Sequence, residues 1–218
     1  MFSHTEENYL KSIYALSSAG QPVLTNDLAQ KMGTRAATVT DMLKKLSRKK
    51  LIIYEPYYGV SLTLKGRKAA VGIVRKHRLW ESFLVNLLGF KWDEVHDMAE
   101  ELEHIRSVKL IDKLDSFLGH PTSDPHGDPI PDAKGRVPKQ DMIRLPEADK
   151  GKTLTITGVI NHTPVFLQYM EKIGVKIGNT IRIVSVNEVD ESMKVAVGRG
   201  TGHFFSRETA QNILVTSR

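Results

Sequence analysis

A stretch of nine residues, from 96 to 104, gathers side chains that can bind a metal ion. It reads His-Asp-Met-Ala-Glu-Glu-Leu-Glu-His. If the stretch is helical, about 100° of arc contains four candidate ligands: His96, Glu100, Glu103 and His104. Other acidic residues flank that arc. For this helix taken alone, a plain acidic face toward solvent therefore explains the pattern as well as a metal site does.

A second pair of candidate ligands, His77 and Glu81, lies one helical turn apart in an earlier apolar pattern. Burying an unpaired charge costs several kcal/mol. A hydrogen-bonded His–Glu pair meets that cost, and so does a metal ion. Two such helices side by side would combine nitrogen and carboxylate ligands in a set that is typical of first-row divalent metals.

The chain has 218 residues and no cysteine, which excludes disulfides, thiolate zinc sites, iron–sulfur clusters and cysteine nucleophiles. Any metal must therefore be bound through nitrogen and oxygen. An apolar content of 40% supplies one or two ordinary cores, and the length predicts two or three domains. The chain has no long apolar run and no signal-like N-terminus. We therefore expect a cytoplasmic protein with no membrane partner.

Positive charge is concentrated in the first third of the chain. Residues 1–76 carry 13 Lys and Arg against 5 Asp and Glu, whereas residues 77–120 carry 5 against 9. A positive field acts on a polyanion only where it is concentrated. The first third is therefore the part that we expect to bind nucleic acid.

Three short helices and a hairpin are predicted in this basic part. Ser3 and Glu6 fit a capping box at the start of the first helix. Thr25 is expected to cap a second helix that stops at a glycine, and Thr34 to cap a third. Two short helices joined by a tight glycine turn are typical of a helix-turn-helix. Residues 54–63 have strand-forming residues on either side of a Pro and Gly bend, which predicts a hairpin wing.

The third helix exposes small and hydrogen-bonding side chains near its N-terminal end, where such residues let a helix enter the major groove deeply. The base-reading candidates are Thr34, Arg35, Ala36, Ala37, Thr38, Thr40 and Asp41. The candidates for phosphate contacts are Lys44, Lys45, Arg48, Lys49, Lys50, Tyr57, Tyr58 and Lys65. A solvated basic helix is the alternative, but the capped helix pair and the hairpin favour double-stranded DNA as the partner.

Two longer helices are predicted to carry the candidate metal ligands. Thr63 opens a helical pattern that runs to about Leu88. The next helix, with Asp93 as its cap, is predicted to run without a break to about Leu118.

Five of the nine prolines lie between residues 121 and 138, which marks a linker. Beyond it, a helical piece at 166–173 and β-rich runs separated by glycine turns predict a small SH3-like β-barrel. The β-rich runs are 154–157, 180–184 and 194–197.

The predicted fold class is thus multidomain α+β, with a winged helix-turn-helix, a helical dimerisation domain and the small barrel. The predicted boundaries are 1–75 for the winged helix-turn-helix, 76–120 for the helical domain, 121–150 for the linker and 151–218 for the barrel.

Several short motifs occur in a fixed order along the chain: 5–11, 37–40, 77–81, 95–97, 100, 103–104 and 124–131. Together they resemble the diphtheria toxin repressor family of metal-dependent regulators, and the resemblance covers essentially the whole chain. It implies a DNA-binding domain, a helical domain for metal binding and dimerisation, and a C-terminal domain like that of ferrous-transport accessory proteins.

The resemblance also implies two metal sites per subunit. An ancillary site is implied at His77, Glu81 and His96, with Asp124, His126 and His162 as candidates to complete it. A primary, activating site is implied at Asn8, Glu100, Glu103 and His104, with Glu7 beside Asn8. Manganese-responsive members have a further Glu where this chain has Lys11, which cannot be a ligand while it is protonated.

The ligand types set the expected metal. Iron-responsive members have Met at the position of Asn8 and Cys at the position of Glu100, whereas this chain offers oxygen at both. Harder ligands favour harder ions, so Mn²⁺ is the expected cofactor and Fe²⁺ the second choice. Zn²⁺ or Co²⁺ is expected to bind in vitro, because the Irving–Williams order places both above manganese.

These inferences combine into a metal-activated regulator that binds DNA. We expect a homodimeric repressor of metal-uptake genes, joined through the helices at 64–118, that binds a palindromic operator. We expect no enzymatic activity and no small-molecule substrate. A metallohydrolase that uses the His and Glu cluster, and a DNA-binding protein that acts without metal, are the alternatives.

Overall fold

The computed structural model describes residues 2–17, 21–198, 200 and 202–217. The chain forms two compact units, each assembled from several stretches and each with its own hydrophobic core. The first unit contains Met1–His77, Glu100–Asp112 and Pro131–Arg136. The second contains Arg78–Ala99, Lys113–Ile130 and Val137–Arg218.

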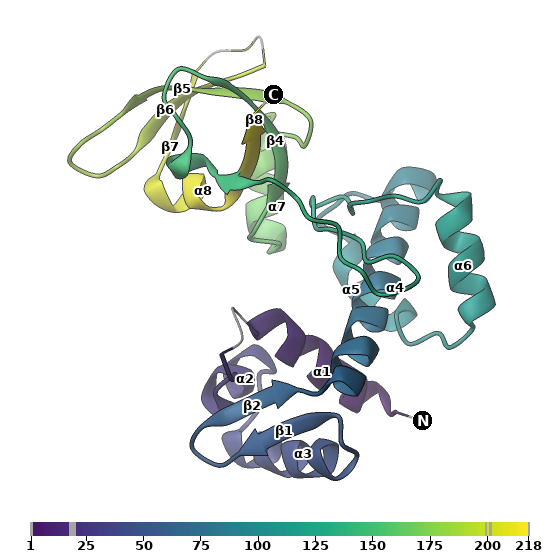
Figure 1. The fold of residues 1–218 in the computed structure, drawn as a ribbon. Helices are drawn as coiled ribbons and strands as arrows, with labels where there is room; N and C mark the ends of the chain where they lie inside the picture. The colour runs from purple at the N-terminus through teal and green to yellow at the C-terminus, as the bar shows by residue number, and fades with distance from the viewer. Residues whose placement is uncertain (1, 18–20, 199, 201, 218) are drawn as a thin grey trace. The chain divides into compact units, whose positions relative to one another are not determined.

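Three helices and a two-stranded hairpin form the N-terminal part of the first unit (Figure 1). They are α1 (His4–Leu16), α2 (Thr25–Lys31), α3 (Ala36–Arg48), β1 (Ile52–Glu55) and β2 (Gly59–Leu62). Their apolar faces meet in one core, to which α3 contributes Val39, Leu43 and Leu46 at the spacing of one helical face. The predicted winged helix-turn-helix is confirmed.

The start of α1 follows the prediction. The Ser3 hydroxyl accepts from the backbone N–H of Glu6 at 3.2 Å, and the Glu6 carboxylate accepts from the backbone N–H of Ser3 at 3.0 Å. This reciprocal capping box fixes the first turn of α1.

The predicted caps of the next two helices are wrong. Val23 pairs with Val60, which leaves Leu24 as the extended residue before α2 and places Thr25 inside the helix. The backbone N–H of Thr34 closes the turn after α2 by donating to a carbonyl at 3.0 Å, and α3 begins only at Ala36. Neither threonine side chain caps its helix.

The wing is an antiparallel hairpin in which Ile52 pairs with Leu62 and Glu55 with Gly59. Tyr57 in the connecting loop has a φ of 71°, and Gly59 has a φ of 112°. A side chain at Gly59 would also meet the carbonyl of Val23 at 2.6 Å. The glycine therefore serves both the turn and the close approach of the wing to the chain before α2.

The long helix α4 spans Leu64–Leu88, close to the prediction. The hydroxyl of Thr63 accepts from the backbone N–H of Gly66 at 3.1 Å and caps the helix. A Cβ atom at Gly66 would lie 1.9 Å from the carbonyl oxygen of Leu51. The absence of a side chain there is what lets the first turn of α4 lie on the chain that leads into β1.

The predicted single helix from Asp93 to Leu118 is wrong, because the structure has two. They are α5 (Val95–Leu102) and α6 (Val108–Phe117). The Ser107 hydroxyl accepts from the backbone N–H of Leu110 at 3.2 Å and caps α6. Asp93 does not start α5; its carboxylate accepts from Gln168 at 2.8 Å. Glu103 and His104 therefore lie in the turn after α5.

The C-terminal part of the second unit is a six-stranded antiparallel sheet in the order β3-β8-β4-β5-β6-β7. Its elements are β3 (Ile143–Arg144), η1 (Leu145–Glu147), β4 (Thr153–Val159), α7 (Pro164–Lys172), β5 (Thr180–Val186), β6 (Met193–Val197), β7 (Gly202–Phe205), α8 (Arg207–Gln211) and β8 (Ile213–Ser217). The expected small β domain is confirmed, with the three predicted strands and the predicted helix in place.

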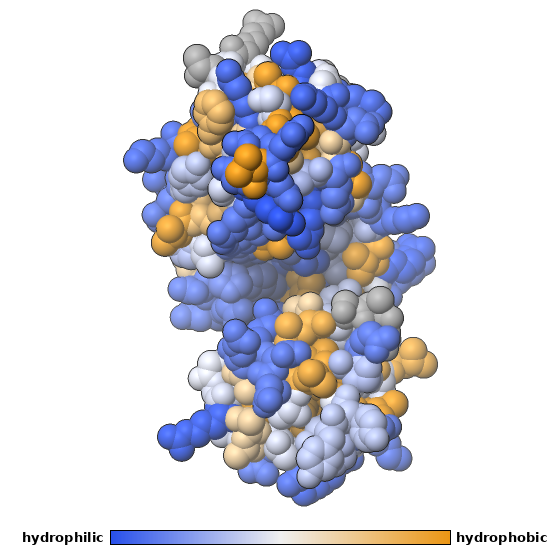
Figure 2. All heavy atoms as spheres, turned by 90° about the vertical axis from the view of Figure 1, so that its left-hand side faces the viewer, coloured by the Kyte–Doolittle hydropathy of each residue, from blue (hydrophilic) through white to orange (hydrophobic). Residues whose placement is uncertain are grey.

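Hydrophilic side chains cover most of the face drawn in Figure 2, with apolar residues between them. Within the described ranges, no helix has both the length and the apolarity needed to cross a bilayer.

Candidate metal centre and nucleic-acid interface

One face of α1 carries the polar side chains that meet the turn after α5. Glu7 and Asn8 lie one helical turn before Lys11 on α1, while Leu10 and Ile13 are buried in the core. All of these residues belong to the first unit. The helix thus places Glu7 and Lys11 against Glu100, Glu103 and His104 without disturbing the apolar side that anchors it.

Glu103 is the centre of the first cluster and is fully buried. Its Oε2 accepts from Nδ1 of His77 at 2.6 Å and from Nζ of Lys11 at 2.8 Å. Lys11 also contacts the carboxylate of Glu100. Nδ1 of His77 in α4 thus contacts Glu103, a contact that the sequence did not predict, while the grouping of His77 with Glu81 and His96 that the family resemblance implies stays a prediction.

A second contact in the same unit joins His104 to α1. Its Nδ1 donates to Oε2 of Glu7 at 2.6 Å. The ring of His4 stacks on that of His104 with a centroid distance of 4.2 Å. The sequence pattern indicated Glu7 only as a neighbour of Asn8 and gave no sign of His4. The spacing offered one sign of Glu7: it precedes Lys11 by four residues, so both side chains lie on the same face of α1.

The donors of this cluster fit a divalent metal ion. His77, Glu100 and Glu103 each offer one ligand atom, and these atoms lie within 4.8 Å of one another. Oδ1 of Asn8 and Oε1 of Glu103 are buried without a hydrogen-bond partner among the described residues. Imidazole nitrogen with carboxylate and amide oxygen is a donor set that suits manganese, iron and zinc. An ion bound by Glu103 would satisfy an oxygen that the protein leaves without a partner.

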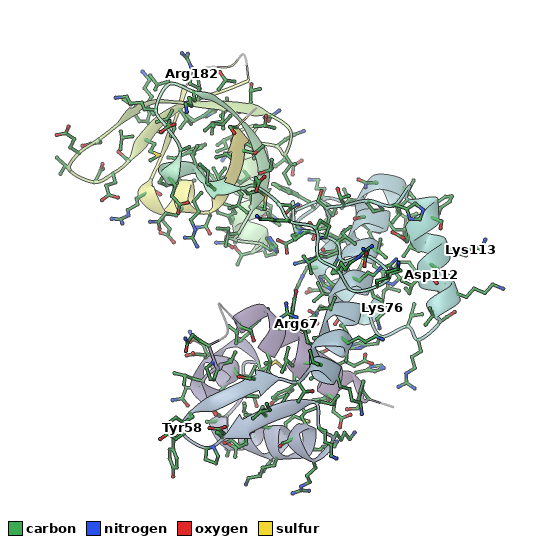
Figure 3. All side chains as sticks on the ribbon, viewed as in Figure 1. Tyr58, Arg67, Lys76, Asp112, Lys113 and Arg182 are labelled. Carbon is green, nitrogen blue, oxygen red and sulfur yellow. The ribbon has the colours of Figure 1, made fainter. Side chains whose placement is uncertain are left out.

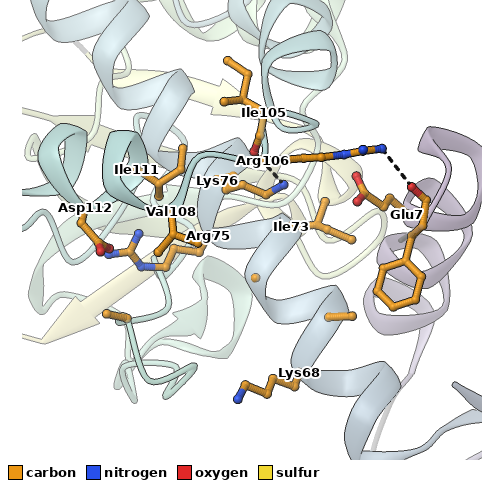
Figure 4. Close-up of a pocket in the computed structure, with 14 residues that line it drawn as sticks. Glu7, Lys68, Ile73, Arg75, Lys76, Ile105, Arg106, Val108, Ile111 and Asp112 are labelled. Atoms are coloured by element: carbon orange, nitrogen blue, oxygen red, sulfur yellow. Dashed lines mark hydrogen bonds between the residues drawn. The ribbon is translucent and has the colours of Figure 1, made fainter.

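A cavity of about 360 Å³ opens beside this cluster, within the first unit (Figure 4). Glu7, Ile73 and Lys76 lie on its wall, as does Arg106, which donates to the carbonyl of Phe2 at 3.2 Å. Burial lowers the pKa of Lys76, and the charges of Glu7 and Glu103 partly offset this effect. Positive groups therefore surround the carboxylates on this side.

A separate cluster of candidate ligands lies in the second unit. Glu81, Asp124 and His126 are all buried, and each offers one ligand atom within 4.8 Å of the others. Nδ1 of His126 is 3.7 Å from Oε2 of Glu81 and 3.9 Å from Oδ1 of Asp124, too far for hydrogen bonds. His96 is half exposed, with its Nδ1 3.7 Å from Oε1 of Glu81.

The loop of residues 123–129 holds this cluster in place. Oδ1 of Asp124 accepts from the backbone N–H of His126 at 2.8 Å and from that of Asp128 at 3.0 Å. The carbonyl of His126 accepts from the backbone N–H of Val159 in β4 at 2.9 Å. A side chain at Gly127 would lie 2.1 Å from a carbonyl oxygen of β4, so only glycine permits this approach.

The tautomer of His126 suits a metal ligand. Its Nε2 donates to the carbonyl of Trp92 at 2.8 Å. In the neutral ring, Nδ1 therefore presents its lone pair toward Glu81 and Asp124, and this buried atom has no hydrogen-bond partner among the described residues. His162 stacks on His126 with a centroid distance of 4.6 Å, but its own Nε2 donates to the carbonyl of Val159 at 3.0 Å.

The ionisable groups of the second cluster shift one another's pKa values. Burial, together with the negative charges of Glu81 and Asp128, raises the pKa of Asp124 to about 7. Burial alone would lower the pKa of His126, but Glu81 and Asp124 raise it above its usual value. Burial and the neighbouring His126 lower the pKa of His162. A buried carboxyl group that gives up its proton near neutral pH is prepared for a cation.

The candidate DNA-binding side chains lie on the surface of the first unit. Those exposed to solvent are Arg35, Ala36, Ala37, Thr38, Asp41, Lys44, Lys45, Arg48, Tyr57 and Tyr58, while Thr34 and Thr40 are half-buried. Tyr57 is 100% exposed and Tyr58 74% exposed. Tyr58 points away from the tip of the wing (Figure 3). The candidates therefore lie on the surface of α3 and of the wing rather than in the interior.

Two lysines at the C-terminal end of α3, one in its last turn and one directly after it, form ion pairs with α1. The Nζ atoms of Lys45 and Lys49 lie 3.2 and 2.6 Å from Oε1 of the buried Glu6. Burial alone would raise the pKa of Glu6, but the hydrogen bonds from Lys49, the Ser3 backbone and Lys45 lower it to about 2. Lys45 thus has a structural partner in addition to its proposed phosphate contact.

Three protein-family models match the chain in order. They are the iron dependent repressor N-terminal DNA binding domain over residues 1–60, the iron dependent repressor metal binding and dimerisation domain over residues 63–132, and the FeoA domain over residues 143–217. The first two family models describe repressors rather than enzymes, so the metallohydrolase alternative has no support.

Curated relatives and solved structures agree with these models. The chain is 33% identical over 161 residues to an iron-dependent repressor, IdeR, of Mycobacterium leprae, a match that spans 70% of this chain and 69% of the relative. A manganese-dependent transcriptional repressor solved in complex with manganese is 38% identical, with a TM-score of 0.89 over 98% of this chain and 100% of that one. ScaR with bound Zn²⁺ is 33% identical, with a TM-score of 0.80 over 98% and 99%.

Proposed function

The chain belongs to the iron-dependent repressor family of metal-dependent transcriptional regulators, and from this membership we propose that it is a homodimeric, manganese-activated repressor of metal-uptake genes. We propose that it acts in the cytoplasm and that its target is a palindromic DNA operator. Two copies of α3 related by a twofold axis would read half-sites separated by whole turns of DNA, roughly 34 Å or a multiple. The helices at 64–118 join the two subunits.

The observation that carries this proposal is the pair of contacts between α1 and the turn after α5. Glu7 meets His104 at 2.6 Å, and Lys11 meets Glu103 at 2.8 Å. The helix α1 is part of the DNA-binding core, whereas Glu103 and His104 come some 90 residues later in the sequence. A metal ion bound by side chains from both segments stabilises one position of α1.

The primary site is assigned to Asn8, Glu100, Glu103 and His104. His77 and Glu7 join this set because they contact Glu103 and His104 directly. Mn²⁺ is the first choice because no sulfur is present and most donors are oxygen, and Fe²⁺ is the second. Zn²⁺ and Co²⁺ are expected to bind in vitro.

The ancillary site is assigned to Glu81, Asp124 and His126, with the half-exposed His96 as a fourth donor. His162 stacks on His126, and a hydrogen bond from its Nε2 to the carbonyl of Val159 holds its ring in place. An ion at this site neutralises the buried acidic pair and holds the loop of residues 123–129 against β4.

The recognition surface is assigned to the exposed N-terminal part of α3, with the wing tyrosines and the lysines of α3 on phosphates. Small side chains at Ala36, Ala37 and Thr38 let the helix approach base edges, while Lys44 and Arg48 neutralise phosphates. Metal binding is expected to be coupled to DNA binding by about 1–3 kcal/mol per site, which is roughly a 5–150-fold change in affinity.

The deciding experiment measures DNA-binding anisotropy with a labelled operator fragment. Chelator-treated protein is titrated separately with Mn²⁺, anaerobic Fe²⁺, Co²⁺ and Zn²⁺. Wild type is expected to gain affinity with Mn²⁺, Glu100→Ala to lose this gain, and the exposed Glu101→Ala to retain it. Equal affinity with and without metal in wild type would instead identify a DNA-binding protein that acts without metal.

A further inference from the structure

The ammonium group of Lys11 lies where a cation is expected. Its Nζ is 2.8 Å from Oε2 of Glu103 and also contacts the carboxylate of Glu100. The side chain of Lys11 is 16% exposed and that of Glu103 is 0% exposed. This is an interior ion pair between two sequence-distant segments rather than a pair of surface charges, which would contribute little.

The two oxygens of Glu103 are used unequally. Oε2 accepts from both His77 and Lys11, whereas Oε1 is buried without a hydrogen-bond partner among the described residues. One oxygen is therefore already neutralised by the protein, and the other remains for an added cation. With Lys11 bound to Oε2, Glu103 has only Oε1 left to bind a metal ion, so it can bind one ion rather than two.

The charges lead to the same count. Glu100 and Glu103 contribute two negative charges, and the Lys11 ammonium cancels one of them. A single divalent ion beside this group leaves an excess of one positive charge, which the nearby Glu7 can balance. A second divalent ion would add two more positive charges within a few ångströms, in a buried region where like charges repel strongly.

We propose that Lys11 determines the metal stoichiometry of the primary site. Its ammonium group takes the place of a second metal ion beside Glu100 and Glu103, so the site binds a single divalent ion. The inference rests on the proposed function of this site and adds the residue that sets its capacity. Lys11 also competes with the ion for Glu100 and Glu103. A neutral residue of similar length at position 11 therefore raises the affinity for the one ion.

Three substitutions separate charge from donor chemistry. Lys11→Glu reverses the charge and adds oxygen ligands, Lys11→Met removes the charge without adding an oxygen, and Lys11→Arg retains the charge as the control. Bound Mn²⁺ per chain is measured by equilibrium dialysis with metal analysis on the full chain, and electron paramagnetic resonance reports whether two Mn²⁺ ions are coupled.

Lys11→Glu is expected to bind one more Mn²⁺ per chain than wild type and to show the signal of a coupled pair. Lys11→Arg is expected to match wild type, and Lys11→Met to bind Mn²⁺ with about tenfold or greater affinity. Equal counts in wild type and Lys11→Glu, or a coupled pair in wild type, would overturn the inference alone. A count unchanged by Glu103→Ala in wild type would remove the primary site itself, and the proposed function with it.

Discussion

His104 and Glu7 meet through a 2.6 Å hydrogen bond, although 97 residues separate them in the sequence. Glu7 belongs to α1, and His104 follows the end of α5. Asn8, the next residue of α1, has a buried Oδ1 without a hydrogen-bond partner among the described residues. A change at either residue should therefore be measurable in metal affinity before it affects the fold.

His104→Ala is expected to lower the Mn²⁺ affinity of the primary site by about 10–100-fold, because it removes a candidate ligand and frees Glu7. The affinity is measured by competition with a fluorescent chelator. His120→Ala is the matched control, because Nδ1 of His120 makes a similar contact with Asp115, at 2.8 Å, on the surface. An equal loss in both variants would contradict the assignment of His104.

The ion pairs of Glu6 make stability depend on pH. The folded pKa is about 2 against an ordinary value of 4.5, so the stabilisation is present above about pH 4.5 and is lost as the pH falls toward 2. Glu6→Gln should lower the free energy of unfolding by about 1–3 kcal/mol at pH 6, with a smaller difference at pH 3.

The measurement for Glu6 is urea unfolding, monitored by circular dichroism, at the two pH values. Glu101→Gln, at an exposed position, should show little difference from wild type at either pH. A Glu6→Gln deficit of the same size at pH 3 and pH 6 would show that packing, rather than charge, is the cause.

Asp124→Asn should stabilise the metal-free protein at pH 8. The folded pKa of about 7 lies above the ordinary 3.8, so stability contributed by protonated Asp124 is complete below pH 3.8 and is lost as the pH rises through 7. Asparagine stays neutral and keeps the Oδ1 that accepts from His126 and Asp128. The expected gain is about 1–3 kcal/mol at pH 8 and close to none at pH 4.

Tryptophan fluorescence during urea unfolding follows this change, because Trp92 stacks on His126 at a centroid distance of 6.1 Å. The same variant should lose at least about tenfold in metal affinity at the ancillary site. Asp97→Asn, at an exposed position of α5, is the control for a general charge effect. Destabilisation of Asp124→Asn at pH 8 would argue against the raised pKa.

Two glycines of α4 should respond differently to alanine. A Cβ atom at Gly66 would lie 1.9 Å from the Leu51 carbonyl oxygen, whereas one at Gly72 meets nothing within 4 Å. Gly66→Ala should cost about 2–4 kcal/mol in unfolding free energy, and Gly72→Ala should be neutral or stabilising by up to about 1 kcal/mol. Thermal melts of both variants compare them directly, and similar melting temperatures would contradict the packing at Leu51.

Lys44→Ala should weaken binding to every DNA sequence by a similar factor, because a phosphate contact carries no sequence information. The slope of log affinity against log salt concentration should fall by about 1. Anisotropy titrations at several salt concentrations measure the slope, with the exposed Lys109→Ala of α6 as the control. A slope unchanged in Lys44→Ala would remove this lysine from the interface.

Local patterns predicted most of the helices and strands. The capping box of Ser3 and Glu6, the apolar spacing of α3 and the Pro–Gly bend of the wing are each decided within a few residues. The break between α5 and α6 was missed because the apolar pattern continues across it. Ser107 was the available sign, but a serine within a continuing pattern is equally compatible with an exposed helical position.

The residue types of the metal centre were also visible in the sequence, but their pairing was not. Nothing in the spacing connects Lys11 to Glu103 or His77 to Glu103, because these contacts depend on how α1, α4 and the turn after α5 pack together. A helical projection gives the direction of a side chain around its own axis only. Its partner comes from tertiary structure.

Glu6 and Glu7 are consecutive residues with different neighbours: Glu6 binds Lys45 of α3 and Lys49 directly after it, and Glu7 binds His104. The first turn of α1 therefore links the candidate metal site, which Glu7 contacts, to the end of α3, which Glu6 contacts. No flexible segment lies between them in which a displacement at Glu7 could be absorbed. If His104 tilts α1, the movement passes from Glu7 to Glu6 through the peptide bond between them. The ion pairs of Glu6 with Lys45 and Lys49 then transmit it to the C-terminal end of the recognition helix.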